Sequence, residues 1–322
     1  MGNRTVTNQT IANQTAVNFV TLPTLTTLDV SRYPVEDIKA RSLSDALQRN
    51  TTITTLKLSS NGIGPKGQQY LSNALRINKL ESFHIINIED NTVLFIDLLK
   101  IAPLLRSLSL EYSSDDMSHD DTCCLAKILF NNNGAWQQQL QSLSINKIYI
   151  PFGFQSVQLM TNLEHLKINI RYEKQLFDLY CSFPHLKSLH VDVRDSSSNS
   201  FDQLMNISNV SKCLKKLIII GKFSSSLTLY KFILMYQSSL EDLTLKNIYH
   251  PDPINGQQLQ SELIKHLYSL MHFRFHLQFT IKTEEFHKKN YLQTFDWIPV
   301  MIDSKIDNEL TVITVSSFST QN

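Results

Sequence analysis

A short apolar frame returns ten times along this chain and restricts its possible folds more than any other feature. The frame is L-x-x-L-x-L, in which other aliphatic residues or phenylalanine also fill the apolar positions. The first five copies are LTTLDV (25–30), ITTLKL (53–58), LESFHI (80–85), LRSLSL (105–110) and LQSLSI (140–145). The other five are LEHLKI (163–168), LKSLHV (186–191), LKKLII (214–219), LEDLTL (240–245) and LMHFRF (270–275). Consecutive copies lie about 27 residues apart on average, a period typical of stacked structural repeats.

Amphipathic stretches separate the frames, as in LSDALQRN (43–50), QQYLSNALRIN (68–78) and LYKFILMYQSSL (229–240). Their apolar residues recur at i, i+3 and i+4, which predicts helices with one buried face. A single strand–turn–helix unit cannot bury its own apolar faces, so neighbouring units must stack. We therefore expect a polar N-terminal extension (1–21), one α/β solenoid of about ten repeats (22–278) and a C-terminal cap (279–322).

Residues 43–78 resemble the ribonuclease-inhibitor type of leucine-rich repeat, L-x-x-L-x-L-x-x-N-x-I-G-x-x-G-x-x-x-L-x-x-A-L-x-x-N. The matching residues are Ile53, Leu56, Leu58, Asn61, Ile63, Gly64, Gly67, Leu71, Ala74, Leu75 and Asn78. Later repeats, such as MTNLEHLKI (160–168), are similar to those of F-box leucine-rich-repeat proteins, the substrate receptors of ubiquitin ligases. The resemblance implies a horseshoe with parallel strands on the concave face and helices on the convex face. It also implies protein recognition, either as a substrate receptor whose F-box is missing or as a free-standing regulator or immune-type sensor arm.

The segment GIGPKG (62–67) raises a different possibility, because it formally matches the dinucleotide-binding motif GxGxxG. Glu89 and Asp90 lie about twenty residues further on, where such a motif places its ribose-binding acid. However, strands of a doubly wound sheet are continuous apolar runs, whereas polar residues alternate with apolar ones in these frames. The sequence favours a repeat turn over a cofactor loop, and we expect neither catalysis nor a cofactor.

The overall composition gives little indication of a special partner. The 30 basic and 29 acidic residues almost cancel, so charge alone predicts neither nucleic-acid nor membrane binding. The four cysteines have no zinc-site spacing, and the cluster of acidic, histidine and cysteine residues in 115–124 mixes hard and soft ligands without indicating a particular metal. We expect no metal site, no membrane span and a monomer in the cytoplasm or nucleus.

Alternating strand positions predict where a protein partner would bind, because side chains between the apolar anchors point away from the core. The candidate contacts are Lys57, His84, Glu111, His165, Lys167, His190, Asp192, Lys216, Lys246, His272, Arg274 and His276. The later repeats gather the more basic residues, around a possible apolar anchor formed by Ile218 and Ile220. This pattern predicts an acidic partner, attracted more strongly below about pH 6.5 as histidines gain charge. The alternative is an ordinary polar surface with no dedicated partner.

Overall fold

A computed structural model describes much of the chain and divides it into two compact units. The first unit comprises Met1–Pro151 and Ser156–Ile168, and the second comprises Phe152–Gln155 and Asn169–Asn322. The described residues are 4–6, 25–31, 35–59, 63–75, 80–88, 104–112, 122–123, 125, 129–130, 138–150, 160–195, 213–250, 254–282, 293–295, 298, 300–307 and 310–317. Both units are α/β, and most of their strands are parallel.

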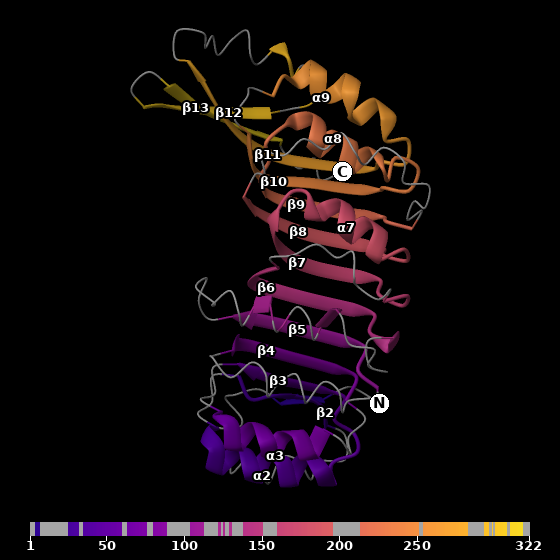
Figure 1. Cartoon of the computed structure of the whole chain (residues 1–322), viewed down its shortest axis with the longest axis vertical. Helices are drawn as coiled ribbons and strands as arrows, with labels where there is room; N and C mark the ends of the chain where they lie inside the picture. The colour runs from indigo at the N-terminus through magenta and orange to yellow at the C-terminus, as the bar shows by residue number, and fades with distance from the viewer. Residues whose placement is uncertain are drawn as a thin grey trace. The chain divides into compact units, whose positions relative to one another are not determined.

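The first unit contains a parallel sheet in which strands adjacent in the sequence are also adjacent in space (Figure 1). Its strands are β1 (Arg4–Val6), β2 (Leu25–Asp29), β3 (Thr55–Ser59), β4 (Ser82–Ile88), β5 (Ser107–Tyr112), β6 (Ser142–Ile150) and the beginning of β7 (His165–Tyr172). Two long helices, α2 (Glu36–Arg49) and α3 (Pro65–Leu75), belong to this unit. Strand β1 lies within the predicted N-terminal extension and pairs in parallel with β2, so part of that extension joins the sheet.

The second unit continues with the end of β7 and then changes strand direction near its C-terminus. Strands β8 (Ser188–Asp195), β9 (Lys216–Lys222), β10 (Asp242–His250) and β11 (His272–Lys282) pair in parallel. Strands β12 (Val300–Asp307) and β13 (Leu310–Ser317) form an antiparallel hairpin, and β13 pairs with β11. Helices α7 (Gln175–Ser182), α8 (Ser226–Leu234) and α9 (Gly256–Glu262) lie on one side of the sheet, and the 3₁₀ helix η2 (Ile264–His266) follows α9 (Figure 1).

The ten frames coincide with strands β2 to β11, which confirms the predicted strand positions. The middle apolar residue of the frame is buried in every repeat except the last, where Phe273 is partly exposed. The nine buried anchors are Leu28, Leu56, Phe83, Leu108, Leu143, Leu166, Leu189, Leu217 and Leu243. Burying one such side chain contributes about 1.5–3 kcal/mol to the free energy of folding. The buried anchors, which stack in columns along each sheet, are therefore a principal source of stability in each unit.

In seven of the described frames, one backbone carbonyl fixes the register with the next strand. The carbonyl of the second residue of the frame accepts hydrogen bonds from two consecutive N–H groups of the next frame. Thus the Thr54 carbonyl accepts from Glu81 N at 2.9 Å and from Ser82 N at 3.0 Å. In the second unit, the Lys215 carbonyl accepts from Glu241 N at 2.8 Å and Asp242 N at 2.9 Å. Equivalent positions of successive frames are therefore held side by side.

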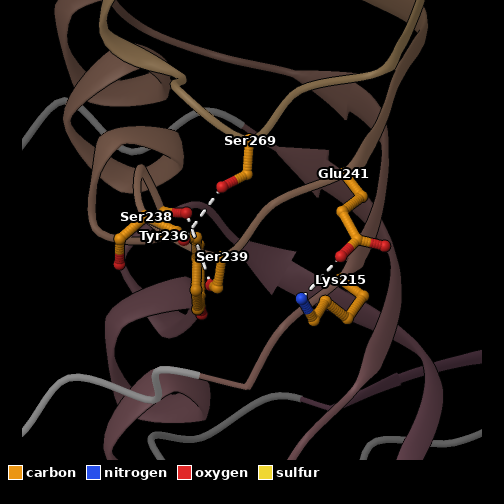
Figure 2. Close-up of polar contacts among 6 residues, drawn as sticks. All are labelled: Lys215, Tyr236, Ser238, Ser239, Glu241 and Ser269. Atoms are coloured by element: carbon orange, nitrogen blue, oxygen red, sulfur yellow. Dashed lines mark hydrogen bonds and ion pairs between the residues drawn. The ribbon is translucent and has the colours of Figure 1, made fainter.

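Side-chain contacts also join neighbouring repeats in the second unit. Lys215 Nζ lies 2.5 Å from Glu241 Oε1 and so links neighbouring repeats (Figure 2). Nearby, Ser269 Oγ donates to the Ser238 carbonyl at 3.0 Å, again from one repeat to the one before it. These polar groups bind one another, so their arrangement is explained by the stacking of the repeats.

A left-handed residue recurs at one place in the strands. Lys147 in β6, Gly221 in β9 and Asn247 in β10 have φ values of 63°, 115° and 51°, and each lies four residues after the buried anchor of its frame. At Asn247 the register of β10 shifts against both β9 and β11, as expected for a β-bulge. The bulge places two consecutive residues, Lys246 and Asn247, in exposed positions.

Gly221 should be the least replaceable of these residues. A Cβ atom at this position would lie 1.9 Å from the Val193 carbonyl oxygen of β8. We expect Gly221→Ala to lower the free energy of unfolding by more than about 3 kcal/mol, measured by urea denaturation. Asn247→Gly is the control, because glycine adopts the left-handed conformation easily, and we expect a change below about 1 kcal/mol. Equal stability of the two variants would contradict this account.

Candidate functional site

Every candidate contact predicted from the sequence lies at an outward, partly or fully exposed strand position. We call the side of each sheet that carries these residues the outward face. In the first unit it includes Lys57, His84, Glu111, His165 and Lys167. In the second unit it includes His190, Asp192, Lys216, Lys246, His272, Arg274 and His276. The two sets are described separately below.

On the first outward face, a charged row crosses β2, β3 and β4. Asp29 is paired in register with Lys57, which is paired with His84, and Lys57 Nζ lies 3.9 Å from Asp29 Oδ2. Partial burial, followed by the positive charge of Lys57, lowers the pKa of His84 below its usual value, although Glu111 and Asp29 act in the opposite direction. The neutral imidazole is therefore favoured in the folded chain.

A second ion pair joins β5 to the left-handed residue of β6. Lys147 Nζ lies 3.6 Å from Glu111 Oε1. Sequence reasoning identified Glu111 but missed Lys147, because a period-2 pattern does not anticipate two consecutive residues, Asn146 and Lys147, that both remain at least partly exposed. The related tetrapeptides NKIY (146–149) and KNIY (246–249) could have indicated that Lys147 and Asn247 share a local conformation.

The remaining row of the first outward face consists of small hydroxyl side chains. Register pairing aligns Thr27, Thr55, Ser82, Ser107 and Ser142 across β2 to β6. These residues are partly exposed and carry no charge. Together with the two ion pairs, they leave the part of this face from β2 to β6 with little net charge to attract a charged ligand.

On the second outward face, two predicted cations share a single carboxylate. Arg274 Nη2 donates to Asp242 Oδ1 at 3.0 Å and to Oδ2 at 3.2 Å. Lys216 Nζ lies 3.6 Å from Asp242 Oδ2. The sequence pattern placed Lys216 and Arg274 among the basic residues that would attract an acidic partner. In the structure both contact Asp242, which reduces their attraction for an outside anion.

Beside this cluster lies a patch with a different character, which we call the β9–β11 patch. It consists of Ile218, Ile220, Thr244, Lys246 and His276. Ile218 is paired in register with Thr244, and Ile220 with Lys246. His276 lies between Phe275 and Leu277 on β11. The register partners of these two residues, Leu245 and Ile248, flank the bulge of β10. His276 therefore faces the bulged pair Lys246–Asn247. The two isoleucines remain partly exposed.

Polar groups of the β9–β11 patch are incompletely paired. Lys246 is exposed and makes no ion pair with any described residue. Two buried atoms, Thr244 Oγ1 and His276 Nδ1, have no hydrogen-bond partner in the described structure. A buried polar atom without a partner costs about 1–3 kcal/mol. The patch therefore combines exposed apolar surface, an unpaired cation and unpaired polar atoms.

A carboxylate of this chain, that of Asp37, contacts the GxGxxG segment. Asp37 Oδ1, from the first turn of α2, accepts a hydrogen bond from Gly67 N at 2.8 Å. A dinucleotide would place its pyrophosphate at such a helix N-terminus, where the carboxylate would repel it. A Cβ at residue 67 would lie 2.7 Å from Asp37 Oδ1 and 2.9 Å from the Ala40 Cβ. Close packing against α2 thus explains this glycine. Asn61, Asn78, Glu89 and Asp90 lie outside the described residues.

A buried carboxylate that the sequence did not reveal lies in the second unit. Glu173 follows β7 and is fully buried. Its side chain accepts hydrogen bonds from Ser224 N at 2.9 Å and from Ser224 Oγ. Ser224 lies just before α8, so Glu173 ties two turns together, and its role is explained by the architecture.

The described residues contain no group of three or more His, Cys, Asp or Glu side chains placed to hold a metal ion. Of the cluster in 115–124, only Thr122 and Cys123 are described. Among the described helices, none has both the length and the apolar composition required to cross a membrane.

No protein-family model matches the chain, and no curated protein sequence resembles it significantly.

The pKa of His84 leads to a prediction about pH. Because this pKa is lower in the folded chain than in the unfolded chain, the unfolded chain binds more protons between the two values. Stability should therefore fall as the pH drops from about 7 towards 5, and His84→Gln should reduce this loss. Urea denaturation at several pH values measures this loss of stability, and His165→Gln, at an exposed histidine, is the control. A wild-type pH dependence in His84→Gln would contradict the prediction.

Proposed function

We propose that this chain is a non-catalytic recognition scaffold of the leucine-rich-repeat type, which binds a protein partner through its outward faces. The β9–β11 patch gives the strongest support. It presents Ile218 and Ile220 at the centre of a strand surface, with Lys246 on one side and Asp192 on the other. Protein interfaces concentrate their binding energy in central apolar residues surrounded by polar ones.

The repeat architecture supports the same proposal. The buried columns use only the apolar positions of each frame, so the outward positions can vary without disturbing the core. In the described strands these positions hold charged, hydroxyl and imidazole groups together with the isoleucines of β9. A surface that varies independently of the core suits recognition of a particular protein.

Two versions of this function follow from the resemblance noted in the sequence. The first is substrate recognition, similar to that of F-box leucine-rich-repeat proteins. The second is a free-standing regulator similar to ribonuclease-inhibitor-type repeats. Recovery of a cullin adaptor, directly or through a companion subunit, would favour the first version, and its absence from a complex that holds another stable partner would favour the second.

The role of the apolar pair can be tested by affinity capture from a lysate of cells that express the chain. We expect Ile218→Thr/Ile220→Thr to reduce recovery of the specific partner by at least about tenfold, because central apolar contacts dominate binding energy. Threonine preserves the β-branched shape that strands favour, and urea denaturation of each variant verifies folding.

Leu227→Thr is the matched control, since Leu227 lies on α8 and is 55% exposed. It should recover the same partner as the wild type. Identical recovery by the double variant would contradict binding through the β9–β11 patch.

A further inference from the structure

We propose that the bulge in β10 is a carboxylate-binding position, at which Lys246 binds an acidic side chain of the partner segment. An apolar side chain of the same segment would cover Ile218 and Ile220. This inference rests on the proposed function and adds the chemistry of the partner: an acidic peptide segment with an aliphatic or aromatic residue next to its acidic residue.

The chain itself contains a comparison for this site. In the first unit, the left-handed residue of β6 is a lysine, Lys147, one position after the place that Lys246 holds in β10, and the neighbouring strand supplies a carboxylate from Glu111 at 3.6 Å. Glu111 lies three residues after the anchor Leu108, and the residue three positions after Leu217 in β9 is Ile220. Where β5 places an acid beside the lysine of β6, β9 places an isoleucine beside the lysine of β10. The β10 bulge is thus complementary to a carboxylate supplied from outside.

The charges around Lys246 strengthen this complementarity. Lys222 lies on the same outward face one row further along, in register with Tyr249, and both residues are exposed. Lys216 and Arg274 already share Asp242, so the attraction for a new anion is concentrated at Lys246 and Lys222. Neighbouring strands lie about 4.8 Å apart, which allows adjacent side chains of one peptide to reach both Ile220 and Lys246.

The same surface is poorly suited to nucleic acid. Asp192 is paired in register with Ile220 on one side of the patch, and Asp242 precedes Thr244 on the other. These carboxylates would repel a continuous row of phosphates, whereas a peptide can place its acids at separate points. The exposed isoleucines also favour an aliphatic or aromatic side chain over a sugar–phosphate backbone.

Selection from a random peptide library displayed on phage, with the full chain as bait, tests this inference. We expect the enriched peptides to carry Asp or Glu beside an aliphatic or aromatic residue. Synthetic copies are then titrated against each variant by fluorescence polarisation. Lys246→Glu should weaken binding by at least about tenfold, because it replaces an attraction with a repulsion. Lys265→Glu, the same change at an exposed site on η2, should change it less than about twofold.

The possible failures are distinguishable. Peptides that lose binding to Ile218→Thr/Ile220→Thr, but lack acidic residues or bind Lys246→Glu normally, would overturn the carboxylate site and leave the recognition function standing. If every recovered peptide binds the wild type and the double variant equally, both the carboxylate site and the proposed recognition function would be contradicted. A single-stranded oligonucleotide that binds more tightly than the peptides, and loses binding to Lys246→Glu, would assign the lysine to a polyanion and overturn the inference.

Discussion

The shared carbonyl at the second position of most frames is the interaction on which the rest of each unit depends. By accepting two consecutive N–H groups from the next repeat, it fixes the register in which neighbouring strands pair. A slip of one residue would turn every side chain to the opposite side of the sheet. Correct register therefore brings the buried anchors into columns and aligns the outward residues into rows. The core and the outward faces follow from the same backbone contact.

The rows explain how the two outward faces differ. Across β2 to β6, charged residues meet partners on neighbouring strands, as Lys57 meets Asp29 and Lys147 meets Glu111. Across β9 to β11, Asp242 neutralises part of the positive charge contributed by Lys216 and Arg274. Lys246 and the two isoleucines lie next to that cluster, and within the described part of the chain no carboxylate pairs with the lysine. A partner would complete an arrangement that the first unit completes within its own chain.

Sequence reasoning predicted the strand positions, the buried anchors and the outward placement of all twelve candidate contacts, because a period-2 pattern directly encodes which side of a strand is buried. It could not predict which charges meet across strands. Arg274 and Asp242 lie 32 residues apart, and their contact depends on register. It also missed the left-handed Lys147 and Asn247, since a left-handed residue after the frame leaves the apolar frame itself unchanged. The contact of Asp37 with Gly67 was equally hidden, because it joins two helices from different repeats.

Lysine footprinting tests the central claim, that the outward face of the second unit binds the partner, most directly. The full chain, alone and with the captured partner, is acetylated briefly, and the modification of each lysine is measured by mass spectrometry. The account predicts that the partner slows acetylation of Lys246 and Lys222 on the outward face. Lys231 on α8 and Lys265 on η2 should react at unchanged rates. Slower acetylation of Lys231 and Lys265, with Lys246 unaffected, would place the partner on the helices and contradict the account.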